Sequence, residues 1–156
     1  CQLKCPMCLR HKEKMKIGYM DFELYKKIIE ECRRNGVYSI KLSWRGEVLL
    51  HPKIVEMVKY AKERGIKDVG FLTNGGLLDK KLSEQLIDAK LDWISISFDG
   101  LGGKYESIRY PLKYEETLGK IRDLKRQPIM SLQLEKISTM LFHLLLIITR
   151  TVLIKD

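Results

Sequence analysis

The residues VYSIKLSWRGEVLLHPKIVEMVKYAKERGIKDVGFLT (37–73) contain two strand-like segments on either side of a helix-like one. Segments 37–44 and 66–73 are rich in β-branched and aromatic residues, which favour strands. Segment 51–65 has apolar residues at helical spacing, with Pro52 in its first turn and Gly65 at its end. A strand, a helix and a second strand in this order predict a βαβ unit with parallel strands and a right-handed crossover.

The same alternation continues on both sides of this unit. Residues 21–36 predict a helix that Asp21 caps and that Asn35 and Gly36 end, and residues 79–90 predict a helix capped by Asp79. A third strand is predicted at 91–98 and a further helix at 113–126. This order predicts an α/β fold with a parallel sheet. A flavodoxin-like open sheet and a (β/α) barrel both fit, and periodicity does not choose between them.

Size and charge restrict the classes of protein that fit. The chain has 156 residues, of which 45% are apolar and 31% charged, as expected for one soluble globular domain. The net charge of +9 comes from lysines spread among glutamates along predicted helices, and the one basic run, residues 10–16, is interrupted by Glu13. This distribution favours a solvated surface over a nucleic-acid groove.

The last part of the chain differs from the rest. Past Arg126 the alternation and most of the charge are lost, so we expect a core over residues 1–126 and an unmatched tail over residues 127–156, from a reading-frame change or a truncated gene. The most apolar run, residues 140–148, has about half of the roughly 20 residues that span a membrane, so no membrane anchor is expected. The first residue is interpreted as a cut edge, and a reducing cytoplasm is favoured.

Three of the four cysteines, Cys1, Cys5 and Cys8, lie within eight residues at a C-x3-C-x2-C spacing. Disulfides within so short a loop would stabilise little, so the crowding indicates metal ligation. Three thiolates can hold three corners of a 4Fe–4S cluster and leave one iron open. Together with His11 they could instead form a Cys3His zinc site, and the cysteines alone leave both readings level. Cys32 is predicted to be a buried helix residue, not a ligand.

Polar motifs follow each of the predicted strands. Arg45-Gly46-Glu47 follows the first strand, residues 73–75 (TNG) end the second, and Asp99-Gly100 ends the third. In (β/α) barrels, reactive residues lie at the carboxyl ends of the strands. These motifs are therefore expected at one edge of the sheet, while Trp44 and Trp93 are expected in the core or barrel wall.

With these motifs in order, the sequence resembles the radical S-adenosylmethionine (radical SAM) superfamily. Its hallmark is C-x3-C-x-φ-C, and here φ is Met7. WRGEVLLHP resembles the family's G-G-E-P-L-x-x-P stretch, and FLTNG and ISISFDG resemble its third- and fourth-strand motifs. With YESIRYP, the match is most similar to the branch that often carries a C-terminal auxiliary-cluster (SPASM-type) domain. The resemblance implies a partial (β/α) TIM-like barrel, with the first strand upstream of Cys1 and later strands missing.

The resemblance also implies roles for the two N-terminal motifs. Cys1, Cys5 and Cys8 match the ligands of the family's 4Fe–4S cluster. Gly46 and Glu47 match the stretch that receives the amino group of S-adenosylmethionine, through a backbone oxygen and the carboxylate. An ammonium group bound to iron needs such acceptors around its remaining protons.

The remaining implied contacts surround the same cofactor. Ser97 and Asp99 lie where the family contacts the ribose or the methionyl carboxylate, with Ser95 as an additional candidate. Asn74 lies near the same pocket, and Met7 would offer backbone contacts to the adenine edge. No residue of this chain is assigned as catalytic.

The sequence departs from the family pattern at several places. Arg45 and Val48 replace a usual glycine and proline, and the glycine-rich adenine motif of the fifth strand is absent. The resemblance implies an enzyme that cleaves S-adenosylmethionine to a 5′-deoxyadenosyl radical, which removes hydrogen from an unknown peptide or small molecule. Flavodoxin or ferredoxin would supply the electron. We expect the chain by itself to be inactive. A non-catalytic remnant or a Cys3His zinc module is the alternative.

Overall fold

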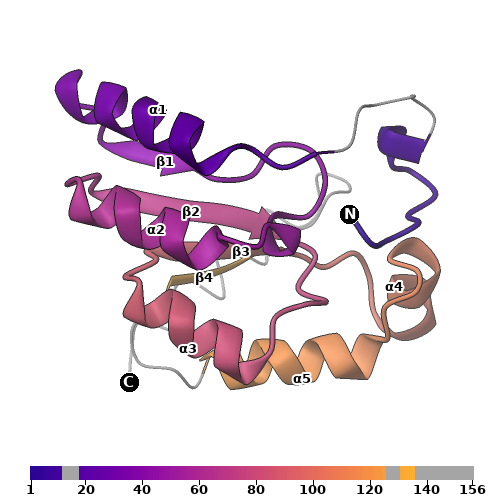
Figure 1. Cartoon of the computed structure of the whole chain (residues 1–156). Coiled ribbons are helices and arrows are strands. Elements are labelled where there is room, and N and C mark those ends of the chain that lie inside the picture. Colours follow the sequence, from indigo (N-terminus) through magenta and orange to yellow (C-terminus); the bar gives the residue numbers. More distant parts are fainter. Residues whose placement is uncertain (12–17, 126–130, 136–156) are drawn as a thin grey trace.

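The computed structural model describes residues 1–11, 18–125 and 131–135, which form a parallel sheet with helices along one side (Figure 1). The sheet has four parallel strands in the order β1-β2-β3-β4. The strands are β1 (Ser39–Lys41), β2 (Asp68–Thr73), β3 (Trp93–Ser97) and β4 (Ser131–Glu135). The helices are η1 (Leu9–His11), α1 (Phe22–Arg34), η2 (Val48–Leu50), α2 (Ile54–Glu63), α3 (Lys80–Asp88), α4 (Gly102–Ile108) and α5 (Tyr114–Lys125).

The predicted α/β fold and its parallel sheet are confirmed, and so are two of the predicted helix caps. The side chains of Asp21 and Asp79 accept hydrogen bonds from the backbone N–H groups of Leu24 and Leu82, at 2.9 and 2.7 Å. Such caps satisfy N–H groups that have no partner within the helix. Each of the first three strands begins two residues after its predicted start, and α2 begins after Pro52 rather than at it.

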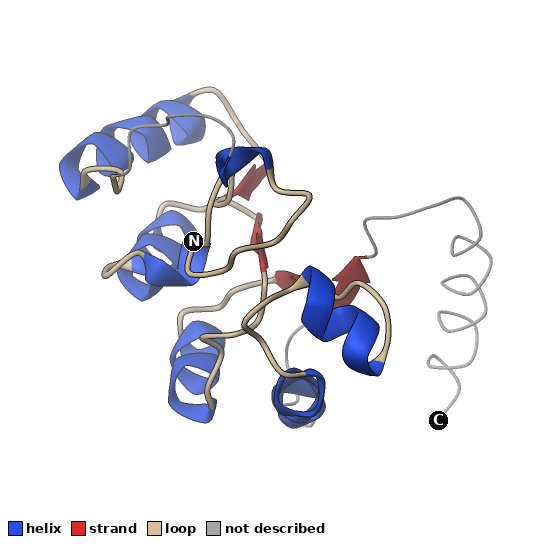
Figure 2. Cartoon of the chain, turned by 90° about the vertical axis from the view of Figure 1, so that its right-hand side faces the viewer, coloured by secondary structure: helices blue, strands red, loops and turns tan. Residues whose placement is uncertain are grey.

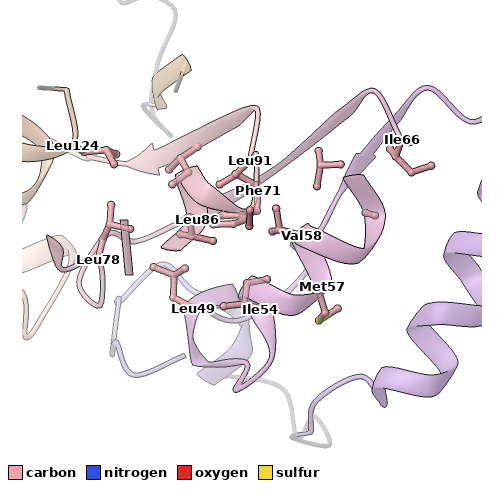
Figure 3. Close-up of a cluster of buried hydrophobic side chains, with 14 of the residues drawn as sticks. Leu49, Ile54, Met57, Val58, Ile66, Phe71, Leu78, Leu86, Leu91 and Leu124 are labelled. Carbon is pink, nitrogen blue, oxygen red and sulfur yellow. The ribbon is translucent and has the colours of Figure 1, made fainter. Parts of the chain in front are cut away.

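The main core lies between the sheet and the helices that cover it. Strand residues Val69, Phe71, Ile94 and Ile96 are fully buried there, and helices α2, α3 and α5 supply the facing side chains (Figure 3). The apolar positions of the helices recur at helical spacing, so each helix presents one apolar side to the sheet. This packing fixes the direction of the strands and therefore places all their carboxyl ends at one edge.

The strands form a curved row with the helices outside it (Figure 2). This arrangement is that of a partial (β/α) barrel. Because side chains alternate along a strand, Gly70 and Trp93 lie on the inner face, opposite the core. The indole of Trp93 covers Gly70, where an added Cβ would lie 2.2 Å from the ring. Trp93 thus forms part of the barrel wall, as predicted.

The edge strand β1 borders a cavity of about 500 Å³. Ile28 and Cys32 of α1, Ile40 of β1 and the exposed Trp44 are among the residues that line it. The prediction that Trp44 is buried is wrong, because β1 ends at Lys41 and leaves the indole in a loop, 89% exposed. Cys32 is half-buried and packs against the core rather than within it.

Helix α4, strand β4 and the two short helices η1 and η2 were not predicted from the sequence. Helix α4 lies between the third predicted strand and the helix predicted at 113–126, and β4 lies beyond Arg126, where the predicted alternation of strands and helices ends. The expectation of no strand beyond Arg126 was wrong. Strand β4 is defined by its pairing with β3, in which Ile94 lies opposite Leu132 and Ile96 opposite Leu134. The division of the chain at residue 126 stays a prediction.

None of the described helices has the length and apolar character needed to cross a membrane. The apolar run at residues 140–148 and most of the basic run at residues 10–16 lie outside the described residues.

Candidate functional site

The predicted site residues gather at the carboxyl edge of the sheet. β1, β2 and β3 end at Lys41, Thr73 and Ser97, and the N-terminal loop lies beyond the ends to which their arrows point (Figure 1). This edge is where the loops of neighbouring parallel strands meet. The structure therefore places the cysteine loop beside the motifs that follow the strands.

Glu47 lies in the loop that follows β1 and is 8% exposed, and its carboxylate is bonded to the end of β2. Oε1 accepts hydrogen bonds from the hydroxyl of Thr73 at 2.5 Å and from the N–H of Leu49 at 3.1 Å. Oε2 accepts one from the N–H of Asn74 at 2.8 Å. These three bonds satisfy much of the buried charge and fix the carboxylate in one orientation.

Asn74 connects the same edge to the first residues of the chain. Its Nδ2 donates to Cys1 Sγ at 3.7 Å and to Gln2 Oε1 at 3.3 Å, while Gln2 Nε2 donates to Asn74 Oδ1 at 3.1 Å. Gly46 also lies beside the N-terminus, because a Cβ placed on it would be 3.8 Å from the Cys1 nitrogen. With φ of +104°, Gly46 has a backbone conformation that other residues rarely adopt. The structure thus brings Cys1, Gly46, Glu47 and Asn74 together.

The other two cysteines of the motif lie in one tight turn. The N–H of Cys8 donates to the carbonyl of Cys5 at 3.0 Å. Cys5 is buried, Cys1 and Cys8 are half-buried, and all three thiols are free. Burial raises the pKa of the Cys5 thiol, while the charge and a hydrogen bond of Arg109 act to lower it.

Asp99 has a partner that the sequence analysis missed. Its Oδ2 accepts a hydrogen bond from Arg109 Nε at 2.5 Å, and Arg109 Nη2 forms an ion pair with the same oxygen. Both side chains are buried, so Asp99 is not a simple surface turn residue. The only signal for Arg109 in the sequence was its presence in YESIRYP, because nothing in the local pattern shows that this cation is buried.

Three predicted contact residues lie near the edge but are not joined to the thiols. Ser97 ends β3 and is buried, and within the described residues the buried hydroxyl of Ser95 has no hydrogen-bond partner. Met7 is 47% exposed. No hydrogen bond within the described part of the chain connects Met7 or Ser97 to a cysteine. Their roles as cofactor contacts stay predictions.

The three thiols fit a cluster better than a single ion. Among residues 1–11, 18–125 and 131–135, no three histidine, cysteine, aspartate or glutamate side chains are arranged to hold one metal ion. A 4Fe–4S cluster is larger and takes one thiolate for each iron, so its ligands need not meet at one point. Three free thiols on one loop have the required donor chemistry. The side chain of His11, the fourth ligand of the zinc alternative, lies outside the described residues.

Comparison with protein families agrees with this arrangement. The model of the radical SAM superfamily matches residues 1–143. The chain belongs to the radical SAM superfamily. The match continues past residue 126 and includes β4.

Two curated relatives share part of their sequence with the chain. It is 34% identical over 136 residues to the GTP 3′,8-cyclase of Chlorobaculum tepidum, covering 86% of this chain and 41% of the relative. It is 29% identical over 134 residues to a tungsten-containing aldehyde ferredoxin oxidoreductase cofactor-modifying protein of Pyrococcus furiosus, covering 76% and 37%. The chain thus spans about two fifths of the length of these relatives.

Two solved structures share this fold. BtrN in complex with AdoMet and 2-DOIA aligns with a TM-score of 0.67 at 19% identity, over 86% of this chain and 52% of that one. Native anSMEcpe with bound AdoMet aligns with a TM-score of 0.64 at 21% identity, over 85% and 40%. At these identities the likeness shows the fold, a partial TIM-like barrel.

Proposed function

We propose that this chain is the cluster- and S-adenosylmethionine-binding part of a radical SAM enzyme. The observation that carries the proposal is the position of three free thiols, Cys1, Cys5 and Cys8, at the carboxyl edge of a parallel sheet. The buried Glu47 and Asn74 lie at the same edge. Family membership supports the assignment. The carboxyl edge of the strands is also where (β/α) barrels hold their reactive groups.

The three thiolates would hold the cluster, each through a different iron. When bound, a 4Fe–4S cluster supplies the electron that cleaves S-adenosylmethionine to methionine and a 5′-deoxyadenosyl radical. The chain's part is to bind and orient this cofactor and to keep water from it. Asn74 supports the loop from the sheet side through its amide contact with Cys1.

Glu47 has the remaining capacity for an ammonium group. An ionised carboxylate offers about four lone-pair positions, and three are used by Thr73, Asn74 and Leu49. The fourth would accept a hydrogen bond from the amino group of S-adenosylmethionine, and the backbone oxygen of Gly46 would accept another. A charge-assisted hydrogen bond there would orient the cofactor with respect to the open iron.

The inner face of β3 would hold the rest of the cofactor. Ser97 and Asp99 would contact the ribose or methionyl carboxylate, and the backbone of Met7 the adenine edge. Ser95 alternates with Ile94 and Ile96 and so lies on the same face, and its buried hydroxyl has no hydrogen-bond partner among the described residues. This supports its inclusion, since a buried hydroxyl without a partner costs free energy. For Asp99, such a contact would be made while Arg109 holds Oδ2.

The substrate is a peptide or small molecule of unassigned class. One relative is named for cyclising GTP and another for modifying a cofactor, so relatives of this chain differ in what they act on. A cytoplasmic flavodoxin or ferredoxin would supply the electron. An auxiliary-cluster domain further along the chain is part of the same proposal.

Anaerobic reconstitution with iron and sulfide tests the proposal. We expect a brown protein with nearly equal iron and sulfide and a visible absorption that bleaches on reduction. Replacing Cys1, Cys5 or Cys8 singly by Ala should abolish this absorption, because a three-point attachment has no spare ligand. Cys32→Ala is the matched control and should keep the cluster. A tightly bound colourless zinc without sulfide would instead establish the zinc alternative.

A further inference from the structure

The side-chain amides of Gln2 and Asn74 form a reciprocal pair at the carboxyl edge of the sheet. Gln2 Nε2 donates to Asn74 Oδ1 at 3.1 Å, and Asn74 Nδ2 donates back to Gln2 Oε1 at 3.3 Å. Gln2 belongs to the cysteine loop and has no role in the proposed function, while Asn74 follows β2, 72 positions further along the chain. Two hydrogen bonds between these side chains therefore join the cysteine loop to the turn after β2.

The contacts of the Asn74 amide decide which way it is turned. Its Oδ1 also accepts a hydrogen bond from the backbone N–H of Gly76 at 2.9 Å, so a flipped amide would turn its NH2 group toward another donor. Gln2 presents a donor and an acceptor in the complementary order and stabilises the same orientation. The two hydrogens of Asn74 Nδ2 are thereby directed to Gln2 Oε1 and to Cys1 Sγ, which lies 3.7 Å from that nitrogen.

The turn after β2 has room for the Gln2 amide because position 76 is a glycine. A Cβ there would lie 3.0 Å from Asn74 Oδ1 and 3.2 Å from Gln2 Nε2, closer than ordinary van der Waals contact. Lys120 Nζ of α5 donates to the carbonyl of Gly76 at 2.5 Å, which holds the same turn from the other side. The position of the Asn74 amide is thus defined by α5, by the end of β2 and by the cysteine loop.

The Asn74 amide is aimed at an atom whose charge changes when iron binds. Sulfur is a weak acceptor in a thiol, and a hydrogen bond to the thiolate that binds metal is strengthened by its charge. Asn74 is 5% exposed, so little water competes for its NH2 group. One-electron reduction adds negative charge to a thiolate-bound cluster, and hydrogen bonds to the sulfurs are among the factors that set its potential.

We propose that Gln2 is a positioning residue for the cluster, which holds the Asn74 amide with its NH2 group toward Cys1 Sγ and so favours the reduced form of the cluster. The proposal rests on the proposed function, because it needs a cluster bound to Cys1. Gln2 acts only through Asn74. Its effect on the potential should therefore vanish in a chain that lacks the Asn74 amide, whereas a general contribution to the fold would not depend on that amide.

The test measures the one-electron midpoint potential of the reconstituted full chain, with iron and sulfide determined first in each variant. Dithionite supplies the electron and no atom is transferred. Gln2→Met keeps the length of the side chain but removes both amide groups, and should lower the equilibrium constant for reduction about threefold. That is a shift of about 30 mV to more negative potential, at about 59 mV for a tenfold change.

A double-mutant cycle shows whether Gln2 acts through Asn74. Asn74→Ala removes the donor itself and should shift the potential at least as far in the negative direction. Adding Gln2→Met to Asn74→Ala should then give no further shift. Gln85→Met is the matched control, because it makes the same substitution at an exposed position on α3, and its potential should equal that of the parent.

The motion of the Asn74 side chain gives a readout that needs no cluster. In the reduced full chain without iron, ¹⁵N relaxation should show the NH2 group of Asn74 to be as ordered as the backbone around it. Gln2→Met removes two of the hydrogen bonds of this amide and should increase its motion. Gln85→Met should leave it unchanged.

Each outcome decides for or against the role of Gln2. If Gln2→Met keeps the parental potential, or shifts it equally with and without the Asn74 amide, the role is refuted while the proposed function stands. If Gln2→Met or Asn74→Ala binds no cluster, the motion of the Asn74 amide decides, and unchanged order in Gln2→Met refutes the role. If the parent itself binds no cluster, the proposed function and this inference both fail.

Discussion

Replacing Glu47 by Ala should lower the free energy of unfolding by about 3–6 kcal/mol, because two buried N–H groups lose a charged acceptor at about 1.5–3 kcal/mol each. These groups belong to Leu49 and Asn74, at 3.1 and 2.8 Å from the carboxylate oxygens. The hydroxyl of Thr73 loses the same acceptor but can rotate toward another one, so it adds less. A loss of this size is a large share of the stability of an ordinary domain.

Glu47→Gln keeps the volume of the side chain but removes its charge and one of its two acceptor oxygens. Whichever way the amide is turned, one of the two backbone N–H groups faces an NH2 group and has no acceptor. About half of the loss found for Glu47→Ala is therefore expected. Glu84→Ala is the control, because Glu84 is exposed on α3 and its Oε1 lies 3.9 Å from Lys80 Nζ. Such a surface ion pair contributes about 0–1 kcal/mol.

Urea unfolding followed by circular dichroism, without cluster or cofactor, measures these differences. A loss below about 0.5 kcal/mol for Glu47→Ala, the usual size for a surface substitution, would refute the reasoning from its three hydrogen bonds. The affinity for S-adenosylmethionine is a separate readout. If Glu47 also receives the amino group, Glu47→Ala should weaken binding by about 1.5–3 kcal/mol, roughly one to two decades, without loss of iron. Lower stability with unchanged affinity would restrict Glu47 to a role in the fold.

Two further predictions concern the sheet and its helices. Gly70→Ala should cost about 1–3 kcal/mol, because its Cβ would lie 2.2 Å from the indole of Trp93. Adding Trp93→Leu should recover part of that loss in a double-mutant cycle, and fully additive losses would contradict the contact. Burial raises the pKa of Tyr25, whose hydroxyl donates to Met57 O at 2.9 Å. The folded chain therefore keeps this proton where the unfolded chain, with a pKa of about 10, loses it, so stability should fall above about pH 10. Tyr25→Phe should make that fall less steep in unfolding measurements, and an unchanged slope would exclude Tyr25 as its source.

Local patterns were sufficient for most of the fold. The caps Asp21 and Asp79 and the apolar spacing of α1, α2 and α3 act over a few residues, so the sequence predicted these helices directly. Helix α4 and strand β4 were missed because their local signals are weak. Helix α4 has seven residues and begins with two glycines, which are poor helix formers, and β4 is a short strand whose pairing with β3 defines it.

The site was predictable only in part. Strand ends locate the loops of a parallel sheet, so the sequence placed Glu47, Asn74 and Asp99 at one edge together with the cysteines. It did not show that the Glu47 carboxylate is bonded to Thr73 and Asn74 at the end of β2, or that Asn74 contacts Cys1. Such contacts join residues that are 26 to 73 positions apart along the chain, and no short pattern records them.

The sequence by itself determined the order of strands and helices and the three thiols of the cluster motif, because both depend on residue types at short, fixed spacing. Only the tertiary structure decided which polar groups are buried and with which partners. Arg109 looks like any basic residue near a helix end, and it becomes a buried ion pair with Asp99 only when the end of α4 lies against the end of β3 in the folded chain. Burial is the physical reason, since a charge removed from water has to find its counter-ion and hydrogen bonds in distant segments of the folded chain.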